Sequence, residues 1–294
     1  MSRKVGIRTA ECLPELVSSP TSFARSIVGL GTEKRDRRYH EWSNQNTLSG
    51  CVREHVLGYR FELSRSEVIW ASLAETFLVG EAVHWFLQND PRVFGDKLVG
   101  YWKCHACGNR VFGTRPKEES CSQCGALIEA TFYDEFWTKV IRDDMAFNGR
   151  IDGFFKMDER GKKLYIGEYK TIEGNAWQEL TAPLMDHVFQ LHCYLIFAPL
   201  AGFPEPLHDN RGIILYVSKS HQRDYPVKAF WVNRDKDLSD LIVARATEAR
   251  KYIKSGKGFP KPLDNCIDTD WRGSSSVSCP AAKKCQEIWR KKVQ

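Results

Sequence analysis

The sequence contains no long apolar segment. A helix that crosses a bilayer needs about 18 or more consecutive apolar residues, and no such run occurs. The first residues, MSRKVGIRTAECLPEL, also lack the apolar stretch of roughly 7–15 residues that marks a secretory signal. Glycine and proline, at 21 and 12 of 294 residues, are too few and too scattered for a fibrous or disordered chain. We therefore expect a cytoplasmic protein that does not contact a membrane.

Internal repeats and low-complexity tracts are also absent from the sequence. Hydrophobic residues make up 42% of the chain and charged residues 27%, which is enough apolar sequence to bury a core without disulfides. The net charge is +6 at pH 7. Such a mildly basic balance permits an anionic partner without requiring one.

Helical and strand-like patterns alternate from residue 66 onward, whereas residues 1 to about 60 read as polar and irregular. Helices are predicted over 66–88, over 183–198 starting at Pro183, over about 235–254, and in a short segment after Pro280. Strands are predicted over 147–157, 162–171, 211–219 and 226–232, and a polar turn over 158–161 joins the first two. This order indicates an α/β domain.

The ten cysteines are clustered, which in a reducing compartment indicates metal binding rather than disulfides. Cys104-x2-Cys107-Gly and Cys121-x2-Cys124-Gly are two such pairs, and the glycine after each pair permits a tight turn beneath a metal ion. Together they predict a closed, structural site with four thiolates, for which zinc is favoured although iron fits the same ligands. The basic residues that flank the pairs suggest contact with nucleic acid; they are Lys103, Arg110, Arg115 and Lys117.

A predicted hairpin brings carboxylates together. With its turn near residues 159–160, antiparallel pairing places Asp152 opposite residue 168 to within about one position. Glu168 and Lys170 share one face of their strand, and Tyr169 takes the other. Two carboxylates favour Mg²⁺ or Mn²⁺, and a lysine beside the ion can act on an attacking water. The alternative is a plain surface salt bridge between Glu168 and Lys170.

Two further features are weak when taken alone. His84 continues a helical stripe with Leu73, Phe77 and Gly80 and so points toward the core, where a histidine is more often structural than a ligand. Gln190 and Tyr194 are neighbours at i and i+4 on a predicted helix.

Four motifs together resemble the RecB-like branch of the PD-(D/E)XK nucleases. They are G-x-x-x-H at 80–84, G-R-I-D at 149–152, E-Y-K at 168–170 and Q-x-x-x-Y at 190–194, and the resemblance covers roughly residues 48–290. It implies a central mixed sheet flanked by helices. It also implies that His84, Asp152, Glu168 and the backbone carbonyl of Tyr169 hold Mg²⁺ or Mn²⁺. Lys170 would then act on the water, and Gln190 and Tyr194 would position the strand.

Four more cysteines extend the resemblance to the iron–sulfur RecB-like exonucleases, including the CRISPR-associated family and the AddB nuclease domain. One lies ahead of the core and three lie behind it: Cys51, Cys266, Cys279 and Cys285. The resemblance implies a 4Fe–4S cluster that staples the N-terminal segment, residues 1–60, to the C-terminal segment, residues 261–294. The nuclease core would span 61–260 with a zinc-ribbon insert at 100–128. Cys12 remains an alternative to Cys51, because Val52 replaces the proline that often follows this cysteine.

The function implied by the resemblance is metal-dependent exonuclease action on single-stranded DNA ends in replication, recombination or repair, with protein partners in such a complex. Arg150, Lys219, Arg223 and the C-terminal lysines are candidate phosphate contacts, and some of the nine tryptophans could stack on bases. Two alternatives are a non-catalytic nucleic-acid-binding or protein-binding module and a double-strand endonuclease of the same superfamily. A redox protein is disfavoured because the sequence has no nicotinamide or flavin fingerprint.

Overall fold

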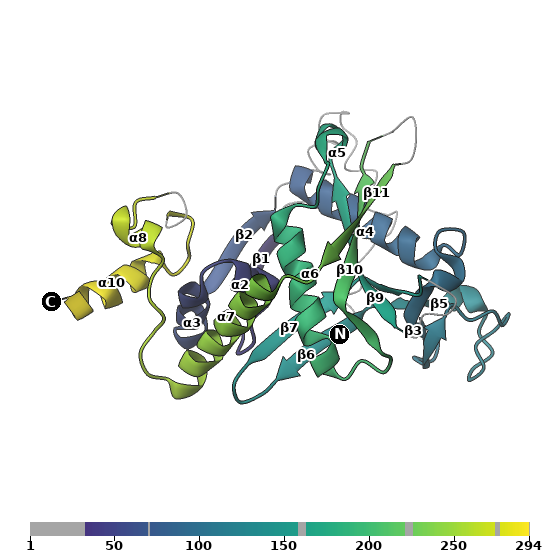
Figure 1. The fold of residues 1–294 in the computed structure, drawn as a ribbon, viewed down its shortest axis with the longest axis horizontal. Helices are drawn as coiled ribbons and strands as arrows, with labels where there is room; N and C mark the ends of the chain where they lie inside the picture. The colour runs from purple at the N-terminus through teal and green to yellow at the C-terminus, as the bar shows by residue number, and fades with distance from the viewer. Residues whose placement is uncertain (1–32, 70, 158–162, 221–225, 274–276, 294) are drawn as a thin grey trace, which may run out of the picture. The chain divides into compact units, whose positions relative to one another are not determined.

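The computed structural model describes residues 33–69, 71–157, 163–220, 226–273 and 277–293 (Figure 1). The chain divides into two compact units, one formed by Met1–Arg37 with Arg65–Val79 and the other by Arg38–Ser64 with Gly80–Gln294. In the first unit, strand β1 (Glu33–Arg38) pairs with β2 (Ser64–Ile69) in a two-stranded sheet, and helix α4 (Ala71–Asn89) begins. The predicted helix over 66–88 therefore started too early. The partner of β2 is distant in sequence, so a local pattern could not reveal this strand.

The second unit is built on a mixed seven-stranded sheet with the order β11–β10–β9–β8–β3–β4, to which β5 is added beside β3. Its strands are β3 (Leu98–Cys104), β4 (Arg110–Thr114), β5 (Thr131–Asp134), β8 (Gly153–Phe155), β9 (Leu164–Ile172), β10 (Leu207–Ser218) and β11 (Val227–Asn233). The β9–β10 pair is parallel and its neighbours are antiparallel. The expected α/β class with a mixed central sheet flanked by helices is confirmed.

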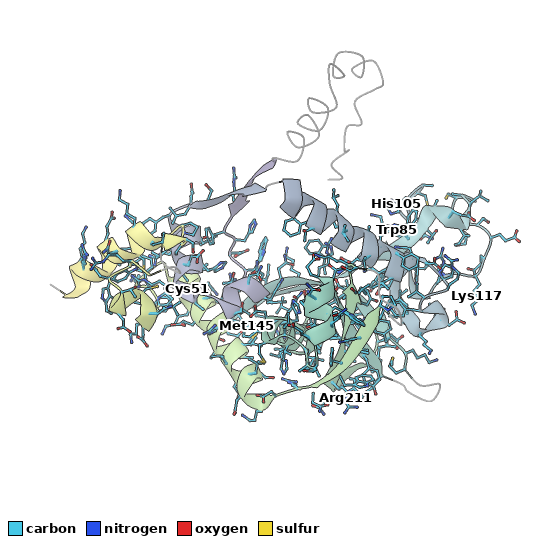
Figure 2. All side chains as sticks on the ribbon, turned by 90° about the horizontal axis from the view of Figure 1, so that it is seen from above. Cys51, Trp85, His105, Lys117, Met145 and Arg211 are labelled. Atoms are coloured by element: carbon cyan, nitrogen blue, oxygen red, sulfur yellow. The ribbon has the colours of Figure 1, made fainter. Side chains whose placement is uncertain are left out.

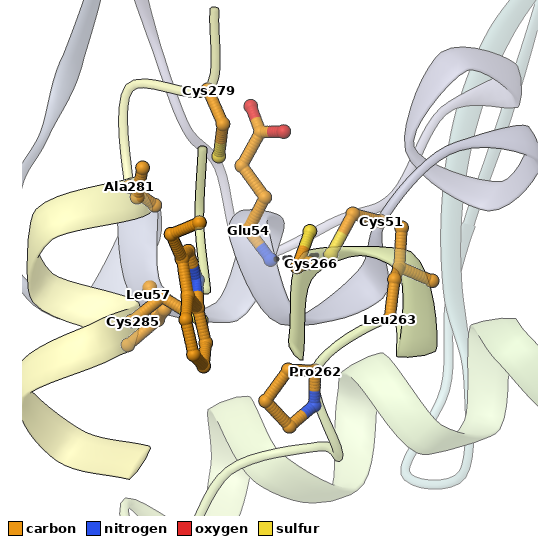
Figure 3. A pocket seen from close by; sticks show the side chains of 11 residues that line it. Cys51, Glu54, Leu57, Pro262, Leu263, Cys266, Cys279, Ala281 and Cys285 are labelled. Carbon is orange, nitrogen blue, oxygen red and sulfur yellow. Dashed lines mark hydrogen bonds between the residues drawn. The ribbon is translucent and has the colours of Figure 1, made fainter. Parts of the chain in front are cut away.

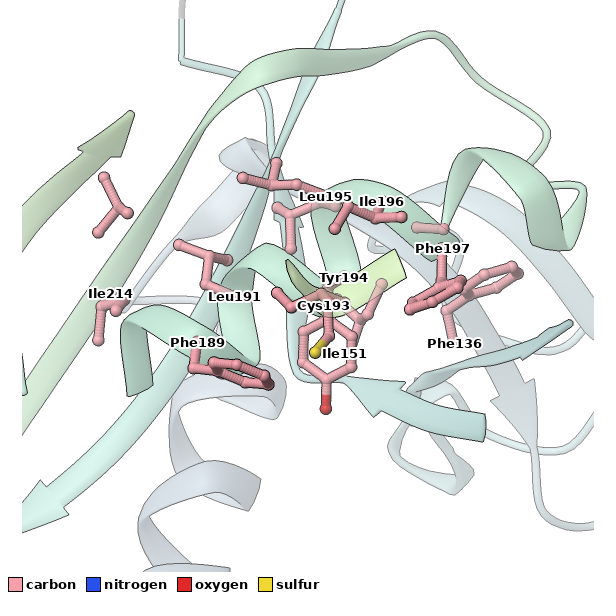
Figure 4. Close-up of a cluster of buried hydrophobic side chains, with 14 of the residues drawn as sticks. Phe136, Ile151, Phe189, Leu191, Cys193, Tyr194, Leu195, Ile196, Phe197 and Ile214 are labelled. Carbon is pink, nitrogen blue, oxygen red and sulfur yellow. The ribbon is translucent and has the colours of Figure 1, made fainter. Parts of the chain in front are cut away.

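The helices lie on both faces of this sheet. On one face, α6 (Met185–Phe197) packs its buried residues against β9 and β10 in the largest apolar cluster (Figure 4). On the other face, Val83 and Leu87 of α4 join a second cluster with Trp102 and Tyr169. The predicted stripe on this helix was partly wrong, because Phe77 is exposed, whereas Leu87 is buried and Val83 is partly buried. Because strand residues alternate, Ile166 and Tyr169 of β9 face opposite clusters.

A separate hairpin adjoins the sheet. Strands β6 (Phe136–Ile141) and β7 (Ala146–Ile151) form their own two-stranded sheet, and β8 begins two residues after β7 ends. Asp152 therefore sits at the break between strands of two different sheets. Further helices are α5 (Gly174–Glu179), α7 (Lys236–Ser255) and α8 (Asp264–Asp268), and short 3₁₀ turns lie at Gly95–Lys97, Ile128–Ala130 and Pro199–Ala201. Helix α7 starts where the Asp235 side chain caps the Leu238 N–H, and it ends at Gly256 in the left-handed conformation.

Residues 38–60 are more ordered than the sequence suggested. They include α2 (Gln45–Ser49) and α3 (Val52–Arg60), where irregular chain was expected. Helix α3 buries Val56 against α7, and it buries Leu57 against the C-terminal segment that contains α10 (Ala282–Val293). The first and last parts of this unit thus lie side by side (Figure 1). Within the described residues, no helix is both long enough and apolar enough to cross a membrane.

Candidate functional site

Strand β9 and helix α6 build a partly buried polar chain on one face of the sheet. Lys170 Nζ lies 2.6 Å from Oε1 of Glu168 and 2.9 Å from Oε1 of Gln190. Gln190 Nε2 in turn donates to the Tyr194 hydroxyl at 3.1 Å. Glu168 is only 1% exposed, and its Oε2 has no hydrogen-bond partner among the described residues. The surface salt bridge considered from the sequence is therefore a partly buried one, in which one carboxylate oxygen has no partner among the described residues.

The register predicted for Asp152 is confirmed. Gly153 pairs with Gly167, so Asp152 comes opposite Glu168, and its Oδ2 accepts the Tyr169 N–H at 2.7 Å. Its Oδ1 lies 3.5 Å from Nδ1 of His84 on α4. His84 is partly exposed beside this carboxylate, which differs from the predicted core position.

The glycine of the G-R-I-D motif has a packing role. A Cβ atom at Gly149 would lie 2.7 Å from a ring carbon of Tyr194, which is too close for any side chain. Glycine at this position lets α6 approach β7, and this approach brings the Gln190–Tyr194 pair to the site.

Glu135 is a site residue that the sequence analysis missed. His84, Glu135 and Asp152 each offer one ligand atom, and these three atoms lie within 4.8 Å of one another, a spacing suited to one metal ion. Glu168 is not a member of this group. The β6–β7 register could have revealed Glu135, because pairing of Phe136 with Ile151 places residue 135 opposite Asp152.

Two neighbours hold the Glu135 carboxylate in place. Gln88 Nε2 donates to its Oε1 at 2.8 Å, and Arg150 Nε lies 2.6 Å from its Oε2. The Gln88 amide also donates to the backbone carbonyl of Asp152 at 2.8 Å, so it ties the two acidic residues together.

The electrostatics of the site follow from burying several carboxylates together. Burial raises the pKa of Glu168, the charge of Asp152 raises it further, and Lys170 opposes both effects. Burial likewise raises the pKa of Glu135, and Asp152 again adds to the shift. Burial alone would lower the pKa of Lys170, but the charges of Glu168 and Asp152 raise it overall. The site therefore holds an excess of negative charge that a cation would relieve.

The first cysteine quartet is assembled as predicted. The four sulfurs of Cys104, Cys107, Cys121 and Cys124 lie within 4.8 Å of one another, and the Cys104–Cys124 and Cys107–Cys121 sulfur distances are both 3.8 Å. Gly108 and Gly125 follow the two pairs with φ of +79° and +70°, which confirms that glycine is needed in each turn. The quartet can bind a metal ion.

Three of the four basic residues named around this quartet contact other groups within the protein. Arg110 pairs with Asp134 at 2.7 Å, and Lys117 pairs with Asp96 at 2.7 Å. Arg115 donates to the backbone carbonyl of Asn89. Of the other predicted phosphate contacts, Lys219 lies 3.3 Å from Glu173, and Arg223 lies outside the described residues.

The second cysteine set lines a single pocket. Cys51, Cys266, Cys279 and Cys285 surround it together with Glu54 and Trp271 (Figure 3). No three of these four sulfurs come within 4.8 Å of one another, so this set is wider than the first. Cys51 is the N-cap of α3, and its sulfur accepts the Glu54 N–H at 3.4 Å. Cys12, the alternative to Cys51, lies outside the described residues.

A buried arginine contacts this pocket. Arg53 is 2% exposed, and its Nε donates to the Cys285 sulfur at 2.9 Å. Its other donors reach the backbone carbonyls of Pro260 and Cys285. Within the described part of the chain Arg53 forms no ion pair with a carboxylate. The Arg53 guanidinium is therefore held against Cys285 and the backbone of Pro260 at the edge of this pocket.

Comparisons with known proteins give little further information. No family model matches the chain, and no curated protein matches it. One solved structure, described as "Crystal structure of SSO0001", is similar over 89% of this chain and 96% of its own, with 15% identity and a TM-score of 0.37.

Proposed function

We propose that this protein is a metal-dependent nuclease of the PD-(D/E)XK type that hydrolyses phosphodiester bonds in DNA. The observation that carries the proposal is the partly buried chain Glu168–Lys170–Gln190 next to Asp152 and His84. An unsatisfied carboxylate oxygen, further acidic groups and a restrained lysine are the set of groups that phosphoryl transfer needs.

The residues fit a divalent cation. Carboxylate oxygens and a histidine nitrogen are ligands that Mg²⁺ and Mn²⁺ accept, and Glu168 has a buried oxygen without a partner in the described part of the chain. His84, Asp152 and Glu135 would hold the ion, with Glu168 and the Tyr169 backbone carbonyl completing the set. When bound, such an ion activates water and neutralises charge on the phosphate.

The other residues would act by position. The Lys170 ammonium, held by two acceptors, would orient the attacking water and offset negative charge as it develops on phosphorus. Tyr194 is 1% exposed, so we place it behind Gln190, which it keeps directed at Lys170. Arg150, beside Glu135, would contact the substrate backbone.

A 4Fe–4S cluster fits the second cysteine set. The four ligands of such a cluster bind separate irons, which suits sulfurs more widely spaced than those around one ion. Arg53 supplies the positive charge that a buried anionic cluster requires. Such a cluster would join α3 to the C-terminal segment.

Zinc fits the first quartet. Tetrahedral Zn²⁺ with Zn–S bonds of about 2.3 Å has sulfurs about 3.8 Å apart, and two sulfur pairs here have that spacing. Four thiolates leave no open position, so we assign this site a structural role.

Cleavage assays test the proposal. End-labelled linear single strands, linear duplexes and closed single-stranded circles are incubated with Mn²⁺, with and without EDTA. We expect chelator-sensitive shortening of linear single strands and intact circles. Cleaved circles would indicate an endonuclease. Binding of DNA without any cleavage would favour the non-catalytic module.

A further inference from the structure

The outward face of the β6–β7 hairpin carries three exposed aromatic or basic side chains, those of Trp137, Lys139 and Arg150. Along β6, Phe136, Thr138 and Val140 are buried, whereas Trp137 and Lys139 point the other way. Trp137 is 56% exposed. The opposite face of β6 packs in the core, whereas the large apolar surface of Trp137 stays in contact with water.

Each basic residue on this face lies against a ring. The Arg150 guanidinium, directly across the hairpin, is 5.6 Å from the Trp137 ring centre. Lys139 Nζ is 5.1 Å from the ring centre of Trp42, and His40 stacks on Trp42 at 4.7 Å. The backbone of Ser43 pairs with Phe147 and so brings this aromatic pair alongside β7. The cations are thus held at fixed points on an aromatic surface.

This face is continuous with the candidate metal site. Arg150 Nε is 2.6 Å from Oε2 of Glu135. Glu135 belongs, with His84 and Asp152, to the group that could hold a metal ion. Asp143, in the turn of the hairpin, is paired with Lys254, and Glu41 is paired with Arg250. Among the described residues Lys139 contacts a ring but forms no ion pair, so its positive charge is available to an anionic ligand that runs along the hairpin toward the site.

We propose that this face binds the single-stranded segment next to the scissile phosphate, with one base stacked on Trp137 and backbone phosphates on Lys139 and Arg150. Trp42 and His40 position Lys139. This inference rests on the proposed nuclease function and assigns it a substrate path. A single strand is favoured over a duplex because only unpaired bases offer a free ring face, and stacking on an aromatic side chain tolerates any base.

A binding experiment tests the stacking contact. Fluorescence anisotropy measures the affinity for labelled oligothymidine, with Ca²⁺ in place of Mg²⁺ and Mn²⁺ to prevent cleavage. Trp137→Ala should weaken binding roughly 5- to 150-fold, the equivalent of the ~1–3 kcal/mol that one stacked base contributes. Trp137→Phe should recover most of the loss. Lys139→Gln should make the log–log salt slope shallower by about 0.7.

Trp231 provides the matched control. It is 44% exposed on β11, with the Arg211 guanidinium 5.2 Å from its ring centre, so it repeats the same contact elsewhere. In Figure 2, Arg211 lies away from Met145, the residue directly before β7, so this second contact between an arginine and a tryptophan is not on the hairpin. Trp231→Ala should bind oligothymidine like the parent, and circular dichroism melting should show that all variants fold.

The outcomes separate the two proposals. The first outcome is that the parent cleaves DNA while the hairpin variants bind oligothymidine as tightly as the control Trp231→Ala. In that case the proposed binding path along the hairpin is wrong and the proposed nuclease function remains. The hairpin variants are Trp137→Ala, Trp137→Phe and Lys139→Gln. If the parent cleaves duplexes but neither binds nor cleaves single strands, the hairpin path is wrong and the nuclease remains. If the parent neither binds nor cleaves any of the DNA substrates, both proposals are wrong.

Discussion

At the scale of single residues, the proposed chemistry depends most on Lys170. Lys170→Ala should abolish cleavage while leaving Mn²⁺ and DNA binding nearly intact, because its ammonium acts on the water rather than on the ion. The expected loss in rate is at least ~10²-fold, the lower range for acid–base and electrostatic contributions. Single-turnover cleavage and Mn²⁺ titration measure the two effects separately. Asp152→Ala serves as the contrast and should lose Mn²⁺ affinity as well. Turnover at the parental rate in a folded Lys170→Ala protein would rule out this site.

His55, on α3, sets a pH dependence of stability. It is 4% exposed, and burial lowers its pKa to about 4. A lowered pKa means that the folded protein keeps this ring neutral while the unfolded chain protonates it. Its contribution is complete above pH ~6.5 and is lost as the pH falls toward 4, by up to about 3 kcal/mol. Urea unfolding across this range should show the decline, and His55→Gln should flatten it. An equal decline in the variant would contradict the assignment.

At the scale of elements, the cysteine quartet anchors one edge of the sheet. Cys104 ends strand β3. This strand pairs with β4, which lies between the two cysteine pairs in the sequence, and with β5, which follows the second pair, and it joins the main sheet through β8. Cys124→Ser should remove one zinc per chain and speed hydrogen exchange between residues 104 and 130, while α6 stays protected. The melting temperature should fall by about 2–4 °C per kcal/mol lost. Cys193→Ala, in the core and away from both cysteine sets, is the control and should retain its zinc. Unchanged zinc content in Cys124→Ser would contradict a four-thiolate site.

At the scale of the whole molecule, the second cysteine set connects distant parts of the chain. Arg53 and Cys285 are 232 residues apart in sequence yet in contact, so a group held here would close a very long loop. Cys285→Ala should lose iron, lower the melting temperature and expose the segment after Pro260 to proteolysis. After anaerobic purification, metal analysis measures the iron content, and limited trypsin digestion measures how accessible the segment after Pro260 is. Cys193→Ala is again the control. Parental iron content in Cys285→Ala would remove Cys285 from the ligand set.

Helix α3 illustrates why some elements could not be predicted. Its inward face includes Arg53, His55 and Gly58 beside Val56 and Leu57. An apolar periodicity is therefore hidden by polar residues whose partners lie elsewhere in the chain. The helices over 183–198 and 235–254 were predicted nearly correctly, because each buries an apolar stripe against the unit's core.

What the sequence by itself determined is the local geometry. The spacing of each cysteine pair, the glycine behind it and the alternation of Glu168, Tyr169 and Lys170 depend only on turn and strand geometry, which near neighbours set. Only the tertiary structure placed Glu135 beside Asp152, Gln190 against Lys170 and Arg53 on Cys285. These contacts join segments that the pairing and packing of whole elements bring together, and such packing depends on the sum of many distant residues rather than on any local pattern.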